Sequence, residues 1–178
     1  MWIEAIPSVY HKLKQNIKKY PKQKSLNYLM TDKDHMITKF NVSNSYGGMS
    51  SIYKLGTHKK LFPNIKMVKK ILLKSITLKT LINKKRIKIE NYQALIIDVQ
   101  GAELKVLKGI GNYLKYFKYV LLETDNCELY ENSSQVKGLR EYMLKNNYYE
   151  KKIYISFKKN NMELYNILFK KILKNNHH

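Results

Sequence analysis

The sequence predicts an α/β protein built around a mostly parallel sheet. Segments with strand patterns alternate with segments with helix patterns along most of the 178 residues. Two of the strand segments, "ALII" at 94–97 and "YVLL" at 119–122, are continuous apolar runs, which is typical of strands covered on both faces. The chain closes with two β-rich runs, "YYEKKIYISF" and "MELYNILFKKIL", joined by "KKNN". We expect this terminal hairpin to add an antiparallel edge to the sheet.

The elements of the N-terminal half follow from their hydrophobic periodicity. Residues 1–5 indicate a short strand, and Pro7 opens the helical segment "PSVYHKLKQNIKKY", in which apolar side chains recur every three or four residues. Residues 25–32 and 35–43 have strand character, the second of them more exposed. Residues 44–64 are rich in turn formers, and we expect a long loop there.

The C-terminal half continues the alternation of strands and helices. The expected order is strand 66–73, a short helix within 75–87, strand 92–99, helix 102–110, strand 117–125 and helix 133–147. Ser133 or Ser134 is expected to cap the last helix. Gly109 and Gly111 are expected to close the helix in which they lie, as C-cap and turn, so no phosphate-binding glycine loop is predicted. The sequence has no linker and no internal repeat, so we expect a single domain over residues 1–178.

The charge of the chain is strongly basic. It carries 34 Lys and Arg against 13 Asp and Glu, for a formal net charge of +21. Such a field attracts nucleic acid and other polyanions. However, Arg86 and Arg140 are the only arginines, and readers of bases and phosphates favour Arg for its bidentate hydrogen bonds. A basic polyanion-binding module is therefore an alternative function, and nucleic acid is a possible but not the favoured partner.

Cysteine content and hydropathy indicate the cellular compartment in which we expect the protein. Cys127 is the single cysteine, so the sequence offers no disulfide framework and no thiolate metal site, and we predict no metal. No apolar run approaches the roughly 18 residues of a membrane span. The N-terminal residues lack the basic and apolar regions of a signal peptide. We expect a cytoplasmic protein without a membrane span.

Acidic residues stand at the ends of four predicted strands. Glu4, Asp32, Asp98 and Glu123 each lie at or near a carboxyl end, and Glu103 follows at the start of a helix. In open α/β sheets, ligands bind in the crevice beyond these ends. Carboxylates gathered there repel one another, which suggests a ligand that offers hydroxyl or cationic groups. Taken singly, each acid also suits a turn or the first turn of a helix.

The segments resemble, in order along the chain, the motifs of the FkbM-type methyltransferases. The resembling stretches are "WIEAIPSVYHKLKQNI", "LMTD", "GGMSSI", "ITLKTLI", "IIDVQGAELKVLKG", "LLETDNCELYE" and "LREYMLKNNYY". The resemblance covers about residues 2–157, and "IIDVQGAELKVLKG" is its most specific part. It implies a Rossmann-like class I methyltransferase sheet and S-adenosyl-L-methionine as cofactor.

The resemblance also implies roles for the acids. Glu4 would accept hydrogen bonds from the ribose hydroxyls of the cofactor, and Asp32 would lie near its adenine amino group. Asp98 would face the methyl group and the acceptor. Glu103 and Glu123 would line the acceptor side.

The implied reaction is methyl transfer to a hydroxyl of a small acceptor, which we expect to be a sugar or another hydroxylated small molecule. Such a transfer depends on alignment and on a group that takes the hydroxyl proton. Asp98 is the first candidate for that base, Glu123 the second and His58 the third, although a loop histidine is ordinarily exposed. Ser51 is a candidate contact to the substrate.

One part of the family pattern has no counterpart in this sequence. Family members begin with a strand and a glycine-rich turn around the methionine part of the cofactor, whereas this sequence starts at the second strand. The first strand lies between strands two and four in that topology. Its place could be supplied by a longer product or by a partner, or strand two could close directly onto strand four. A non-catalytic remnant of the domain is therefore a further alternative function.

Overall fold

A computed structural model describes residues 1–173 of the chain. Its strands are β1 (Trp2–Glu4), β2 (Ser25–Asn27), β3 (Leu29–Met30), β4 (Ile37–Ser43), β5 (Met67–Ile76), β6 (Ala94–Ile97), β7 (Tyr119–Asp125), β8 (Tyr148–Lys159) and β9 (Met162–Lys171). Its α-helices are α1 (Pro7–Asn16), α2 (His58–Leu61), α3 (Leu78–Lys85), α4 (Glu103–Ile110) and α5 (Val136–Lys145). Short 3₁₀ helices cover Ile17–Lys19, Ile89–Asn91 and Gly111–Tyr116.

The strands form three hydrogen-bonded sheets rather than one. The largest has the order β6-β7-β9-β8, with β6 parallel to β7 and the hairpin strands β8 and β9 antiparallel. A second sheet has the order β3-β5-β4, and β1 pairs in parallel with β2. The antiparallel terminal hairpin is confirmed, and the fold is mixed α/β. The predicted strand 25–32 is divided, because β2 pairs with β1 whereas β3 pairs with β5.

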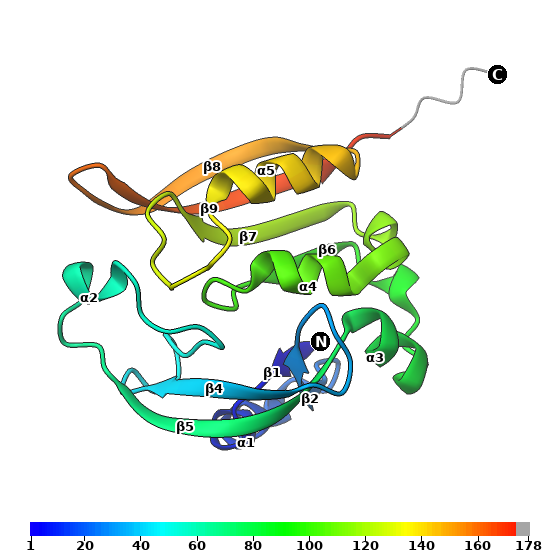
Figure 1. Cartoon of the computed structure of the whole chain (residues 1–178). Helices are drawn as coiled ribbons and strands as arrows, with labels where there is room; N and C mark the ends of the chain where they lie inside the picture. Colours follow the sequence, from blue (N-terminus) through cyan, green and yellow to red (C-terminus); the bar gives the residue numbers. More distant parts are fainter. Residues whose placement is uncertain (174–178) are drawn as a thin grey trace.

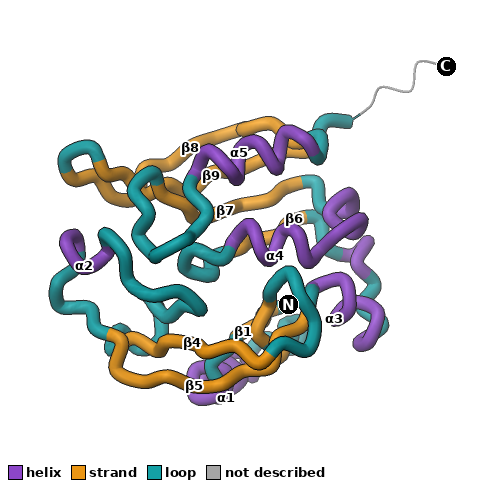
Figure 2. Tube along the Cα trace, in the orientation of Figure 1, coloured by secondary structure: helices purple, strands orange, loops and turns teal. Residues whose placement is uncertain are grey.

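Helices α4 and α5 lie on the same side of the four-stranded sheet (Figure 1). Their apolar side chains pack against strand residues such as Val120, Leu122 and Ile167, each of which is fully buried. Met30 and Ile76, from the second sheet, belong to the same core. Figure 2 shows the β4–β5 hairpin on the far side of α4 from β8 and β9. One continuous core therefore joins the two larger sheets.

Strands β6 and β1 are edge strands of their sheets in the part of the chain that is described, because each pairs with one strand only. Strand β6 pairs with β7 on one edge, and no strand within residues 1–173 pairs with its other edge. Strand β1 pairs with β2, and it is not hydrogen-bonded to β6. Direct closure of the second family strand onto the fourth is therefore not what these residues adopt. Ile96 of β6 is 68% exposed, whereas its neighbour Ile97, on the face that the helices cover, is 3% exposed.

Gly109 allows α4 to approach the second sheet closely. A Cβ atom at this position would lie 2.1 Å from the carbonyl oxygen of Thr31, which follows β3. Gly109 thus lies inside α4 and permits backbone contact, while Gly111 is the C-cap residue, with φ of +58°. The expectation that both glycines end the helix was therefore right for Gly111 and wrong for Gly109.

The start of α5 also differs from the expectation. Its N-cap residue is Gln135, which makes no side-chain capping hydrogen bond, so the prediction of Ser133 or Ser134 as the cap was wrong. Ser133 instead follows Tyr130 in a turn, where its N–H donates to the Tyr130 carbonyl.

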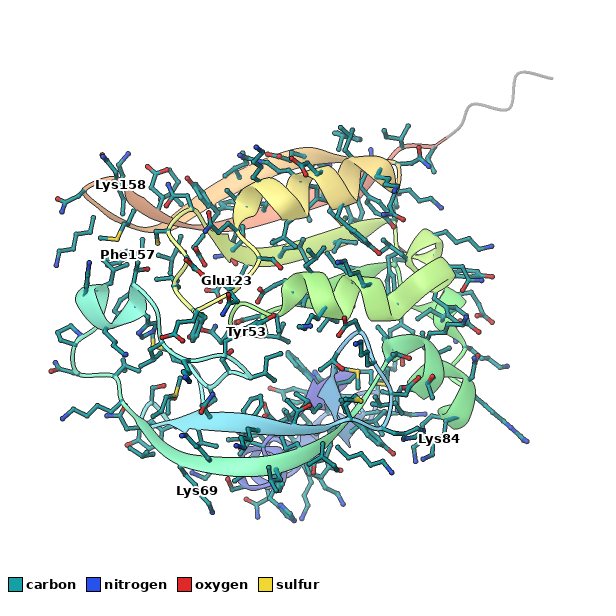
Figure 3. All side chains as sticks on the ribbon, viewed as in Figure 1. Tyr53, Lys69, Lys84, Glu123, Phe157 and Lys158 are labelled. Atoms are coloured by element: carbon teal, nitrogen blue, oxygen red, sulfur yellow. The ribbon has the colours of Figure 1, made fainter. Side chains whose placement is uncertain are left out.

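The labelled lysines Lys69, Lys84 and Lys158 extend outward from separate parts of the molecule (Figure 3). Their charges are therefore spread over the surface rather than gathered on one face. None of the helices within residues 1–173 combines the length and apolar character needed to cross a membrane.

Candidate active site

Two cavities open near the carboxyl ends of the parallel strands. The first, here called the β1 cavity, has a volume of about 280 Å³, and its wall includes Glu4, Val9 and Leu29. The second, the β7 cavity, has a volume of about 230 Å³, and its wall includes His58, Glu123 and Thr124. Gly48, Asp98 and Gln100 belong to the walls of both. The two cavities therefore meet at the turn that follows β6.

The β1 cavity combines the carboxylates of Glu4 and Asp98 with apolar side chains. Glu4 ends β1, and its Oε1 accepts a hydrogen bond of 2.7 Å from the N–H of Ile6. Burial raises the pKa of Glu4, and the N–H of Ile6 acts in the opposite direction. Gly47 brings the loop close to α1, because a Cβ there would lie 2.9 Å from Val9 Cγ2. Only glycine fits this position, where φ is +93°.

The turn after β6, residues 98–103, is fixed by its own side chains and by the long loop. Glu103 begins α4, and its Oε1 accepts hydrogen bonds from the N–H groups of Val99 (3.0 Å) and Gly101 (3.2 Å). The Ser51 hydroxyl donates to the Gln100 carbonyl at 2.7 Å. Gln100 and Gly101 both have positive φ, at +54° and +95°. This backbone geometry directs the Gln100 side chain toward the carboxylates beside it.

Gln100 joins the two acids that the strands deliver. Its Nε2 donates hydrogen bonds of 2.7 Å to Asp98 Oδ1 and of 2.7 Å to Glu123 Oε2. Its Oε1 accepts a hydrogen bond of 2.6 Å from the Tyr130 hydroxyl. One amide thus offsets part of the repulsion between two neighbouring carboxylates and ties them to a buried tyrosine.

The pKa values of the acids in the β7 cavity are strongly raised. Burial, together with the neighbouring Asp98 and Glu103, raises the pKa of Glu123 to about 8, while the hydrogen bond from Gln100 acts in the opposite direction. Burial raises the pKa of Glu103 to about 7, against the lowering effect of the backbone N–H groups that it accepts. Burial also raises the pKa of Asp125. Glu103 and Glu123 are therefore protonated to a large extent near neutral pH.

The residues proposed from the sequence fall into two groups. Glu4, Asp98, Glu103 and Glu123 line one or both cavities. Asp32 lines neither; its Oδ1 lies 3.4 Å from Lys105 Nζ in an ion pair.

Ser51 is fully buried outside the cavity walls. Its hydroxyl is engaged by the Gln100 carbonyl and by the N–H of Tyr53. The roles given to all six residues remain predictions.

Three further residues of the site were not assigned from the sequence. Gln100 and Tyr130 lie inside the quoted motifs "IIDVQGAE" and "LLETDNCELYE", but their contacts depend on the positive φ of the turn and on long-range packing. Thr124 lies between two acids of β7. His58, expected to be an exposed loop residue, is 1% exposed and packs between Phe62 and Tyr130, so that expectation was wrong.

The acids of these cavities are not arranged as a metal site. Among residues 1–173, no group of three or more His, Cys, Asp and Glu side chains is arranged to hold a metal ion.

The sheet order, the helices on one side of it and the acid-lined cavities beyond the strand ends describe an α/β protein with two adjoining cavities at the carboxyl edge of its sheet. Comparison with family profiles matches residues 1–150 to the methyltransferase FkbM domain. The chain therefore belongs to the FkbM methyltransferase domain family. No curated protein and no solved structure gives a significant match.

Proposed function

We propose that this chain transfers a methyl group from S-adenosylmethionine to a hydroxyl of a small acceptor such as a sugar. The observation that carries the proposal is the meeting of two cavities at Asp98 and Gln100, in a chain of a methyltransferase family. A methyl transfer needs a donor and an acceptor that approach each other in line. In this proposal the β1 cavity binds the donor and the β7 cavity binds the acceptor. The methyl group is transferred beside the residues that line both cavities.

The β1 cavity has the chemistry that the cofactor needs. Glu4 offers a half-buried carboxylate, which can accept hydrogen bonds from both hydroxyls of a ribose. Val9, Leu29 and Ile52 give an apolar wall, which suits a base ring. When bound, S-adenosylmethionine supplies an electrophilic methyl group on its sulfonium.

Glu123 and Asp98 are the groups proposed to receive the proton of the acceptor hydroxyl. A base works best when its pKa lies near the operating pH, and the pKa of Glu123 is raised to about 8. Asp98, held 2.7 Å from Gln100 Nε2, faces both cavities and is proposed to orient the hydroxyl. In this proposal Glu123, the more buried of the two acids, takes the proton, and Asp98 orients the hydroxyl that gives it up.

Calorimetric titration with S-adenosylhomocysteine tests the cofactor assignment. We expect the folded protein to bind it, and Glu4→Gln to weaken the affinity about 10-fold through the loss of charged hydrogen bonds. Glu90→Gln is the matched control, because Glu90 is exposed and lines neither cavity. An absence of binding by the folded protein would favour the non-catalytic remnant instead.

A further inference from the structure

We propose that the outward face of strands β4 and β5 binds the surface of an anionic lipid membrane. This face, here called the β4–β5 face, is formed by alternate residues of the two antiparallel strands. Its members are Ile37, Lys39, Val68, Lys70, Leu72 and Lys74. None of them lines either cavity, so the inference does not depend on the proposed function.

The apolar side chains of the β4–β5 face are open to solvent. Ile37, Val68 and Leu72 are 66%, 64% and 67% exposed, and Met36, directly before β4, is 52% exposed. An antiparallel sheet with one face on the core ordinarily carries polar residues on its other face. Single exposed apolar side chains are common in folded proteins, whereas several on one face mark a contact surface.

The register of the two strands sets apolar and cationic side chains beside one another. Ile37 lies opposite Lys74, and Lys39 lies opposite Leu72, so Ile37 and Leu72 are diagonal neighbours. The same face of β5 continues to Val68. The opposite face packs into an apolar cluster through Phe40, Ile71 and Leu73. Hydrocarbon and positive charge therefore alternate on the β4–β5 face, both along β5 and across to β4.

The β4–β5 face carries cations and no acid. Neither β4 nor β5 contains Asp or Glu. The nearest acid before β4 is Asp34, whose carboxylate accepts hydrogen bonds of 2.7 Å from the Thr77 N–H and from the Thr80 hydroxyl. Among residues 1–173, the lysines of this face form no ion pair. Unpaired positive charge thus lies beside exposed hydrocarbon.

This combination fits the surface of an anionic bilayer. Exposed aliphatic side chains can enter the boundary between headgroups and acyl chains, while lysine ammonium groups stay at the level of the lipid phosphates. Each lysine close to an anionic leaflet adds to the attraction, and the net charge of +21 acts in the same direction.

Two other partners fit the β4–β5 face less well. A second copy of this chain, docked face to face, would place lysines against lysines, and like charges oppose such a contact. Nucleic acid is bound largely through arginine forks and aromatic stacking, and this face has neither Arg nor an aromatic side chain. Aliphatic side chains that point outward therefore favour lipid over both.

Cosedimentation with vesicles tests the proposal on the full chain. The probes are vesicles of phosphatidylcholine with about 30 mol% phosphatidylglycerol and vesicles of phosphatidylcholine alone. We expect the anionic vesicles to bind at least about 10-fold more tightly, and added salt to weaken this binding. Absence of binding to the anionic vesicles, or equal binding to both kinds, would overturn the assignment.

Variants of the apolar residues connect the binding to this face. Leu72→Gln and Ile37→Thr change side chains that solvent already reaches, so the fold should persist. Each should weaken binding to the anionic vesicles about 10-fold, because less hydrocarbon enters the bilayer. Leu144→Gln on α5, where the side chain is also 67% exposed, is the matched control and should stay within about 2-fold. Unchanged binding by both hairpin variants would refute the proposal.

Variants of the lysines separate this face from the charge of the whole chain. The triple replacement of Lys39, Lys70 and Lys74 by Gln should weaken binding to the anionic vesicles about 100-fold. The control makes the same replacement at three exposed lysines, Lys137, Lys145 and Lys159. These lie on α5 and β8, on the other side of the molecule from β4 and β5 (Figure 1), so the loss should be about 5-fold or less. Equal losses would contradict the assignment.

Two further measurements distinguish the other partners. A dimer in sedimentation equilibrium without vesicles, lost in Leu72→Gln, would assign the face to a second copy. Binding of a single-stranded oligonucleotide that the triple lysine variant loses, without binding to anionic vesicles, would assign it to nucleic acid. Either result replaces the lipid assignment. Loss of vesicle binding in face variants whose thermal unfolding matches that of the natural protein supports it.

Discussion

The side-chain amide of Gln100 donates a hydrogen bond of 2.7 Å to the carboxylate of Glu123. This bond joins the turn after β6 to the carboxyl-terminal part of β7, at the place where the two cavities meet. Figure 3 shows Glu123 between the four-stranded sheet and the loop that carries Tyr53. The positions of the proposed base and of the cavity wall are therefore coupled through one amide.

The hydrogen bonds of Gln100 should contribute measurably to stability. Gln100→Met keeps the length of the side chain but leaves the Tyr130 hydroxyl and two carboxylates without their partner, so we expect the free energy of unfolding to fall by about 1–3 kcal/mol. In a double-mutant cycle with Tyr130→Phe, the two changes should be non-additive by about 0.5 kcal/mol or more. Urea denaturation followed by circular dichroism measures both quantities. Strict additivity would contradict the contact.

The buried acids make stability depend on pH. The pKa values of Glu103 and Glu123 are about 7 and about 8 in the folded protein, against ordinary values of 4.5. The folded state therefore binds more protons than the unfolded state between about pH 4.5 and pH 8, and the free energy of unfolding falls as pH rises through this interval. Below the interval both states are protonated, and the contribution of these groups to stability is fully present.

Glu123→Gln should remove part of this slope. Between about pH 5 and pH 8, the stability of the variant relative to the natural protein should rise by on the order of 2 kcal/mol. Urea denaturation at intervals of pH measures it, with Glu90→Gln as the exposed control. Parallel curves for all three proteins would show that Glu123 does not titrate in this range.

The two glycines at helix positions 109 and 138 should respond oppositely to alanine. A Cβ at Gly109 would lie 2.1 Å from the Thr31 carbonyl oxygen, whereas a Cβ at Gly138 in α5 has no neighbour within 4 Å. Gly138→Ala should stabilise the protein by about 0.5–1 kcal/mol through helix propensity. Gly109→Ala should lower the free energy of unfolding by several times that amount, because the backbone of α4 or of Thr31 must move to make room for the methyl group. Thermal unfolding of the two variants decides, and equal effects would refute the close approach.

The neighbouring isoleucines of β6 should also differ. Ile97→Ala, at a position that is 3% exposed, should cost about 2–5 kcal/mol, as large-to-small changes in a core do. Ile96→Ala, at a position that is 68% exposed, should cost about 1 kcal/mol or less. Denaturant titration compares them under one condition. Similar losses would mean that something covers Ile96 in solution.

Much of the fold could be predicted from local patterns. Strands β6 and β7 and the β8–β9 hairpin lie where apolar runs and alternation predicted strands. The expectation that β6 is covered on both faces was wrong, because Ile96 is 68% exposed. The division of the sheet could not be predicted. It depends on which strand pairs with which over long separations, as when β2 pairs with β1 while β3 pairs with β5.

The site divides in the same way. Acids at strand ends are visible in the sequence, and topology then brings Glu4, Asp98 and Glu123 to adjoining cavities. The bridging role of Gln100 is not visible, because it requires a positive φ at a residue that rarely adopts one. The burial of His58 depends on its packing against Tyr130, which lies 72 positions further along the chain. Local sequence patterns do not predict such a long-range contact.

The contact between α4 and Thr31 limits which substitutions this sequence can accept during evolution. The helix that begins at Glu103 is held against the neighbouring sheet at a point where no side chain fits. Position 109 should therefore tolerate almost no substitution among homologous sequences, whereas position 138 should tolerate many. A residue contributing no functional group of its own would then be among the slowest to change.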